Sequence, residues 1–441
     1  MEQPDNFNLS HPSPYAIYLP AVNTTYPKIV DDELPPNRPI PSGFTLDDLA
    51  FWSGNSQYWN HKFLLHSIGG YDVGSVSRGP LFRKRPGEFL FLGDCGGFQI
   101  GKGTLKGLRD LKKGISGQAA VEAWGRNYDA KVWIINWLEN HCDYAMTLDM
   151  PLWAMSEFGV DSPFHNCSEE QLLSMTLENL MLIERERQGR TKWLNVIQGT
   201  NAKDTLTWWN AVKWFKDGGW SLAGAAGWRG GLHNVLSIVL RMRDEGAFEP
   251  GRDWVHMLGV SQPKWDIFLT AIQRQLRRSN PNIQISCDSA SPFESGEARD
   301  QYALPPALGK RVADWGVGYE TLTAVRSDAD RTKTTPTPLL SPLGRALTMR
   351  DLVVDDSPMA GRRIDKFTNA LLMNHNTWVY LDAGRRANDA AFNSSTSDDI
   401  PSEFTAVLEI IETAFTTSNW ASVLDTSKEF LVEIAPNMYK G

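Results

Sequence analysis

The stretch WLNVIQGTNAKDTLTWWNAVKWFKDGGWSLA, residues 193–223, contains one complete strand–helix–strand unit. Its two ends, 193–197 and 220–223, are short apolar runs of strand length. Between them, residues 202–215 carry apolar side chains at helical spacing. A helix that joins two such strands is typical of parallel strands, because parallel neighbours need a long crossover connection.

The same unit repeats on both sides of this stretch. Six apolar runs end in a small or polar residue: 88–93, 143–148, 193–197, 220–223, 255–258 and 283–287. Two earlier runs, 15–19 and 63–66, would bring the number of strands to eight. Helix signals lie between the runs, among them a capping box at 168–171 and Pro263 at a first-turn position.

A doubly wound sheet and a closed barrel both fit this alternation. The first run is not followed by the Gly-x-Gly-x-x-Gly pattern of a dinucleotide-binding sheet. We therefore predict a (β/α)8 TIM barrel over residues 1–390, with an N-terminal extension before the first strand. An irregular insertion is expected at 327–363, which is rich in Pro, Thr and Asp. A linker and a short helical tail, with helices at about 402–415 and 420–432, would fill 391–441.

Composition narrows the class of protein. With 41% hydrophobic and 22% charged residues, the 441-residue chain reads as a water-soluble globular protein. The net charge of −8 excludes a protein surface that is basic throughout and coats nucleic acid, but it is compatible with a local basic groove. The start of the chain lacks a signal-peptide pattern, and no apolar run has the length of a membrane span. Four separated cysteines suit a reducing compartment, so a cytoplasmic location is expected.

Polar residues and glycines recur at one place in each unit, directly after an apolar run. They are Asp94, Asp149, Gln198, Gly224, Gly259 and Asp288. The carboxyl ends of the strands of a (β/α)8 barrel converge on a single mouth, where active sites lie. A single aspartate after a strand is usually a helix cap or a turn former. Three carboxylates and an amide at one mouth would repel and desolvate one another, which points to a ligand or a reaction.

Several of these segments resemble the motifs of tRNA-guanine transglycosylases, in the order of that family. Asp94-Cys-Gly-Gly-Phe-Gln99 is similar to its Asp-Ser-Gly-Gly-Phe-Gln signature, and 143–149 (DYAMTLD) to its Asp-x-x-Met-x-x-Asp strand. Further similar segments are 195–199 (NVIQG), 256–260 (HMLGV), 287–291 (CDSAS), 371–376 (LLMNHN) and 380–382 (YLD). The resemblance runs from about residue 88 to residue 390 and implies a base-exchange enzyme on a TIM barrel.

The resemblance assigns the two catalytic roles to carboxylates. Asp288 would be the nucleophile that attacks the sugar C1′ and expels guanine, leaving a covalent enzyme–nucleotide. A carboxylate suits this step because the transition state has oxocarbenium character, as in retaining glycosidases. Asp94 would be the acid/base that handles the proton of the leaving and entering bases.

The remaining residues of the motifs would bind the base. Asp149 would accept from the N1–H and N2–H groups of guanine, and Gln198 would bond O6. Gly224 would let the backbone approach the base, while Phe98 and Leu258 would sandwich its ring. Gln99, Cys95 and Gly259 complete the implied base site. Several positions depart from the family: Cys95 replaces Ser, Leu258 replaces Met, Thr147-Leu148 replaces Ala-Phe, and Ala-Gly-Ala at 223–225 replaces Gly-Gly-Leu.

The family's structural zinc is held by three cysteines and a histidine. His375 matches that histidine, but no cysteine follows Cys287, so tetrahedral thiolate coordination cannot form. We therefore predict no zinc and no other cofactor, with His375 as a hydrogen-bonding helix residue. Because family members often dimerise through the zinc region, both a monomer and a homodimer remain open.

The implied partners are a nucleic acid, with a flipped guanine, and a 7-deazaguanine base as the small-molecule substrate. Lys102 and Lys106 directly follow the first motif and would contact the phosphate backbone. The compact, zinc-less chain most resembles the phage and bacterial relatives that insert 7-deazaguanines, such as 7-cyano-7-deazaguanine, into DNA; for a phage-encoded chain the location would be the host cytoplasm. DNA is therefore the expected partner, with tRNA as the alternative. Two other hypotheses for the function are a non-catalytic scaffold and a Trp-rich barrel glycosidase.

Overall fold

The computed structural model describes residues 12–436 with internal gaps. The gaps are 32–33, 35–37, 78, 84–86, 112–114, 116, 157–158, 261, 323–334, 353–363 and 394–399. None of the described helices is long and apolar enough to cross a membrane.

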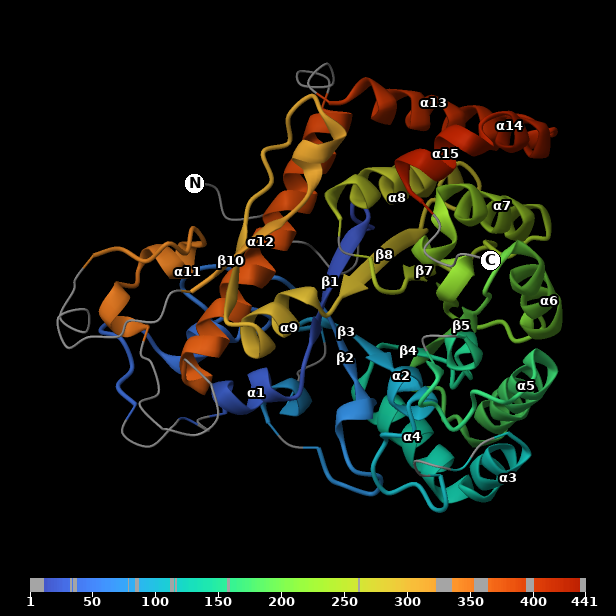
Figure 1. The fold of residues 1–441 in the computed structure, drawn as a ribbon, viewed down its shortest axis with the longest axis horizontal. Helices are drawn as coiled ribbons and strands as arrows, with labels where there is room; N and C mark the ends of the chain where they lie inside the picture. Colours follow the sequence, from blue (N-terminus) through green and yellow to red (C-terminus); the bar gives the residue numbers. More distant parts are fainter. Residues whose placement is uncertain are drawn as a thin grey trace.

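Eight parallel strands form a closed barrel at the centre of the molecule (Figure 1). They are β1 (Ile17–Val22), β2 (Phe63–Ser67), β3 (Leu90–Asp94), β4 (Tyr144–Met146), β5 (Lys192–Ile197), β6 (Gly219–Leu222), β7 (Trp254–Met257) and β8 (Gln284–Ser289). The last strand pairs with the first, with Leu19 opposite Asp288, which closes the ring. The prediction of a (β/α)8 barrel is thus confirmed, including both early strands, and the doubly wound sheet is excluded.

The outer ring of helices is complete on one side of the barrel and reduced on the other. The crossovers from β3 to β8 contain α4 (Tyr128–His141), α5 (Glu169–Glu186), α6 (Ala202–Val212), α7 (Gly231–Asp244) and α8 (Pro263–Leu276). The capping box at Ser168 and Gln171 and the first-turn Pro263 begin α5 and α8 as predicted. In the described part of the first two crossovers, only the short α1 (Thr25–Val30) and 3-10 turns are present.

A long helix closes the ring between the last and first strands. After β8 come α9 (Ser291–Ala298) and an antiparallel hairpin of β9 (Gln301–Leu304) and β10 (Gly318–Thr321). Helix α12 (Lys366–Phe392) then packs against α8, α9 and β1. Of the predicted insertion at 327–363, the structure describes 335–352, which holds α11 (Pro342–Arg345), a 3-10 turn and one isolated bridge. Residues 327–334 and 353–363 of that prediction lie outside the described residues.

The C-terminal tail consists of three helices where the sequence predicts two. They are α13 (Ser402–Thr416), α14 (Trp420–Thr426) and α15 (Lys428–Ile434), which pack on α7 and α8 (Figure 1). The predicted second helix breaks at Ser427, next to Thr426, whose hydroxyl donates to the Ser422 carbonyl oxygen. Of the predicted linker, 394–399 lies outside the described residues.

Two apolar layers hold the barrel together. Inside the ring, aliphatic and aromatic side chains from successive strands fill the centre, among them Leu19, Leu65, Leu194 and Trp254. Between the strands and the helices, large rings dominate. Fully buried tryptophans of the described residues are Trp52, Trp124, Trp193, Trp208, Trp209, Trp220 and Trp315. The high tryptophan content therefore builds the layer between barrel and helices.

One buried carboxyl in that layer makes stability depend on pH. Asp266 on α8 is buried and accepts a hydrogen bond from the Cys287 thiol at 3.7 Å, and burial raises its pKa to about 7. The folded protein therefore binds this proton more tightly than the unfolded chain does, and stability is lost as pH rises through about 4 to 7.

We expect Asp266→Asn, which removes the charge and keeps the shape, to flatten this dependence. The free energy of unfolding should rise by roughly 2–4 kcal/mol at pH 8 and change little at pH 4. Urea titrations of both proteins at the two pH values measure the difference. An equal pH dependence in the variant would show that Asp266 is not the source.

Candidate active site at the barrel mouth

The predicted strand-end residues do meet at the carboxyl end of the barrel. Asp94 is the last residue of β3, and Asp288 lies in β8 one residue before its end. Burial raises the pKa of Asp94, and the nearby charge of Asp288 raises it further. Burial likewise raises the pKa of Asp149 to about 6, with a contribution from Asp94. The charge of Asp288 thus acts on Asp94, and that of Asp94 on Asp149, as expected for carboxyls near one another.

Asp288 is held by two N–H donors on the same oxygen. The backbone N–H of Gly259 donates to Oδ1 at 2.8 Å, and His256 Nε2 lies 3.2 Å from that atom. Gly259 has a φ of 78°, in the left-handed region that favours glycine. A Cβ at this position would also come within 3.1 Å of the Trp228 indole nitrogen. The turn after β7 therefore depends on a glycine to bring its N–H to Asp288.

Asp94 has a different environment. The Ser67 hydroxyl at the end of β2 and the Gly96 backbone N–H both donate to it and favour its charged form. Burial and the charge of Asp288 act in the opposite direction, and burial is the largest influence. Because the net effect raises its pKa, Asp94 keeps a proton to a higher pH than a free carboxyl, as a general acid requires.

Asp149 and Gln198 form a small polar network beside these two acids. Gln198 Nε2 donates to Asp149 Oδ2 at 2.6 Å, and the Cys95 thiol donates to Oδ1 at 3.7 Å. Burial raises the pKa of the Cys95 thiol well above its usual value, so it remains a neutral donor. Both oxygens of Asp149 thus have donors that a bound base could replace.

Gly224 lies against this network. Its φ is 56°, and a Cβ there would meet the Gly199 carbonyl oxygen at 2.5 Å and Gln198 Oε1 at 3.1 Å. The neighbouring Ala225 N–H donates to the Gly199 carbonyl oxygen at 2.8 Å. Only glycine fits this position, so backbone rather than side chain borders Gln198.

Phe98 lies on the rim of the mouth. Its side chain is 54% exposed, with its ring 5.4 Å from the ring of Trp153 and the Lys102 ammonium 4.5 Å above it. Lys106 is also exposed and pairs with Asp72 at 3.6 Å. Trp153 is absent from the sequence prediction, although it follows Asp149 by four residues on the same loop. Rim aromatics next to a lysine suit stacking and phosphate contacts with a nucleic acid.

The other two predicted base-site residues lie on opposite sides of the mouth. Leu258 is half-buried and packs against the apolar layer inside the barrel. Gln99 on α2 (Gly97–Gly101) packs against Gly69 in the turn after β2, where its buried Oε1 has no hydrogen-bond partner among the residues that the structure describes.

His375 is a buried residue of α12. Its Nδ1 accepts from the Ser341 backbone N–H at 3.2 Å, and Nε2 lies 3.0 Å from the Ala303 carbonyl oxygen. Burial lowers its pKa to about 4. Within the described part of the chain, no group of three or more His, Cys, Asp or Glu side chains could hold a metal ion.

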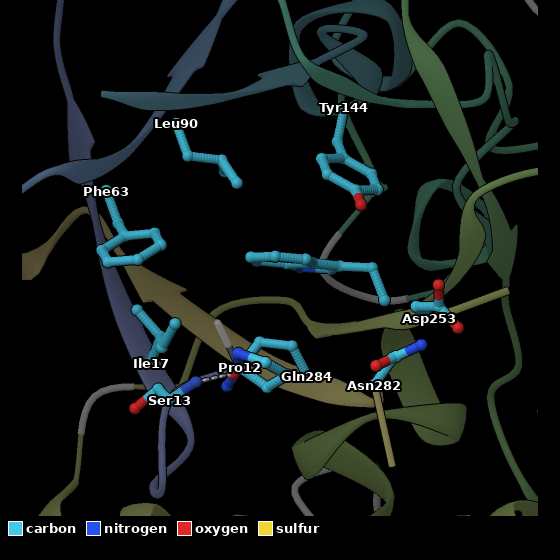
Figure 2. A pocket seen from close by; sticks show the side chains of 10 residues that line it. Pro12, Ser13, Ile17, Phe63, Leu90, Tyr144, Asp253, Asn282 and Gln284 are labelled. Carbon is cyan, nitrogen blue, oxygen red and sulfur yellow. Dashed lines mark hydrogen bonds between the residues drawn. The ribbon is translucent and has the colours of Figure 1, made fainter. Parts of the chain in front are cut away.

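A cavity of about 180 Å³ opens at the opposite end of the barrel (Figure 2). Ile17, Phe63, Leu90, Tyr144 and Trp254, each the first residue of its strand, line it. It therefore lies at the amino ends of the strands, away from the carboxyl cluster. Its walls combine these apolar and aromatic side chains with the polar side chains of Ser13, Asp253, Asn282 and Gln284.

The fold and this site define a (β/α)8 barrel with paired acids at its mouth. No protein-family model matches the chain, and no curated protein matches it.

Proposed function

We propose that the chain is a guanine transglycosylase that replaces guanine in DNA with a 7-deazaguanine. The observation that carries the proposal is the contrast between two acids at one mouth. Asp288 is bonded through Oδ1 by two N–H donors, whereas the pKa of Asp94 is raised by burial and by Asp288 itself. A carboxyl held in place by donors and a neighbouring carboxyl with a raised pKa suit the two roles, nucleophile and acid/base, of a double displacement at a sugar carbon.

In the first step, an oxygen of Asp288 bonds to C1′ as the C1′–N9 bond to guanine breaks. The bonding electron pair leaves with the base, and Asp94 supplies the proton that neutralises it. In the second step, N9 of the incoming 7-deazaguanine attacks C1′ and the ester bond to Asp288 breaks. The N9 proton returns to Asp94, so both acids recover their starting states.

The network of Asp149 and Gln198 would recognise both bases by their shared edge. Guanine and 7-deazaguanine present N1–H and N2–H donors and an O6 acceptor. Asp149 would accept the two donors in place of the Gln198 and Cys95 bonds that it has in the structure. The Gln198 amide, released from Asp149, would then donate to O6.

Asp149→Asn should therefore weaken use of guanine by at least ~100-fold in kcat/KM, because an amide N–H would face the donors of the base. The wild type should also prefer guanine to hypoxanthine, which lacks the N2 amine, and the variant should lose most of that preference. Exchange rates with the two labelled bases measure both effects. An unchanged preference would remove Asp149 from the base site.

The choice of DNA rests on the resemblance to the DNA-modifying relatives, whereas the rim of the mouth could bind a strand of DNA or of RNA. The exposed Phe98 and Lys102, beside the half-buried Trp153, can stack on bases and neutralise phosphates of a strand on either side of an extruded base. The test offers labelled guanine with duplex DNA in one reaction and bulk tRNA in another. Label in DNA alone supports the proposal, whereas label in tRNA alone keeps the reaction and replaces the substrate. Label in neither polymer, with 7-cyano-7-deazaguanine also failing to enter DNA, favours a scaffold.

A further inference from the structure

A chain of polar side chains runs through the interior of the barrel to Asp288. The Trp254 indole N–H donates to Ser286 Oγ at 2.7 Å, and Ser286 Oγ lies 2.8 Å from His256 Nδ1. His256 Nε2 then lies 3.2 Å from Asp288 Oδ1. Ser286 and His256 are fully buried, and Trp254 is 7% exposed.

The register of two strands places these four side chains in sequence. Trp254 and His256 are two residues apart on β7, and Ser286 and Asp288 are two residues apart on β8. His256 is the register partner of Ser286. Because alternate residues of a strand face the same side, both pairs point the same way. The chain therefore alternates between β7 and β8 as it approaches the mouth.

The donors along this chain fix the form of His256. An indole N–H can only donate, so Ser286 Oγ accepts from Trp254 and its own hydrogen is free to donate to Nδ1. The Asp288 carboxylate can only accept, so the ring hydrogen belongs on Nε2. In this arrangement each hydrogen bond from Trp254 to Oδ1 of Asp288 has one donor and one acceptor.

We infer that His256 is a positioning residue for the nucleophile Asp288 and is itself held by Ser286 and Trp254. Because His256 binds Oδ1, the oxygen of Asp288 that attacks C1′ is Oδ2. Oδ1 receives both the His256 and Gly259 N–H groups, whereas Oδ2 has no hydrogen bond among the described residues. The two donors fix the rotation of the carboxylate and leave its second oxygen for the sugar. In the covalent intermediate Oδ1 becomes the ester carbonyl oxygen, and the same donors stabilise the carboxylate when the second base displaces it.

This inference rests on the proposed function, and base exchange is the readout that tests it. His256→Phe keeps a ring but removes both nitrogens, whereas His256→Gln keeps an N–H donor. Ser286→Ala removes only the hydroxyl that orients the imidazole. The matched control is His66→Phe, which removes another fully buried barrel histidine, bonded to the Val22 carbonyl oxygen and the Tyr71 hydroxyl.

We expect His256→Phe to lower kcat by about 10- to 100-fold, the range for losing one hydrogen bond to a charged group, with KM changed by less than about threefold. His256→Gln should recover most of the loss, and Ser286→Ala should lower kcat by a smaller factor. In the His256→Phe background, Ser286→Ala should have no further effect, because the serine acts only through the histidine. His66→Phe should leave kcat near that of the wild type.

A purely packing role for His256 gives a different pattern. The Ser286→Ala and His256→Phe effects would then multiply, and His256→Gln would not recover activity; either result overturns the inference. If Asp288→Asn is inactive while both His256 variants and Ser286→Ala keep full kcat, the inference falls and the proposed function stands. If the wild type itself exchanges no base, both fall. Should His256→Phe fail to fold, Ser286→Ala alone decides, since a wild-type kcat in that variant overturns the chain.

Discussion

Asp288→Asn is expected to abolish base exchange, with a loss of roughly 10⁴-fold or more, the scale seen when a covalent catalyst loses its nucleophile. An amide is nearly the same size as the carboxylate, and its oxygen can still accept from Gly259 and His256 at the Oδ1 position. The amide has no negatively charged oxygen that could bond to C1′ as the glycosidic bond breaks. Incorporation of labelled guanine into DNA measures the loss.

The control for this variant is Asp266→Asn, which neutralises another buried aspartate, bonded to Cys287 rather than placed at the mouth. It should exchange base at the wild-type rate. Substantial exchange by Asp288→Asn would show that another group attacks C1′ and would remove Asp288 from the role of nucleophile.

Asp94→Asn is expected to slow exchange by about 10²- to 10⁴-fold, the usual contribution of a general acid/base. The loss should show a distinctive pH dependence. Because burial raises the pKa of Asp94, the wild type should keep its acid form to a higher pH than a free carboxyl allows. Its rate should then fall as pH rises through that pKa, since the leaving guanine is no longer protonated. In Asp94→Asn this fall should disappear.

Asp149 should cause a second change of the exchange rate with pH, because burial raises its pKa to about 6. The N1–H and N2–H donors of guanine need the charged form of Asp149 as their acceptor. The rate of exchange with guanine should therefore fall as pH drops below about 6, in the wild type and in Asp94→Asn alike. Rates measured from pH 5 to pH 9 separate the two changes. An Asp94→Asn profile that still falls at high pH would assign the acid role to another group.

The barrel could be predicted because its strands are apolar and bounded by turn residues. The runs at 193–197 and 220–223 became β5 and β6 with the expected helix between them. Helix α12 shows where this reasoning ends. Its buried residues include Asn369, Asn374, His375 and Asn376 alongside aliphatic ones, so no apolar stripe marks its full length. The break in the tail at Ser427 likewise has no mark in the apolar spacing.

The site could be predicted only as far as strand ends determine it. Asp94, Asp149, Gln198, Gly224, Gly259 and Asp288 were identified because they follow apolar runs, and the barrel brings them to one mouth. The contact of His256 with Asp288 depends on the register of β7 against β8, which the sequence does not specify. The contact of Trp153 with Phe98 depends on how the loop after β4 folds back over α2.

The most direct test of the account is to identify the covalent intermediate. The wild type would be incubated with duplex DNA without an incoming base, denatured, treated with nuclease and protease, and analysed by mass spectrometry. A nucleotide remnant on the peptide that contains Asp288, absent from Asp288→Asn and lost when guanine is added before denaturation, is the predicted result. A remnant on any other residue, or label exchange into DNA without a remnant on Asp288, would contradict the central role of this aspartate.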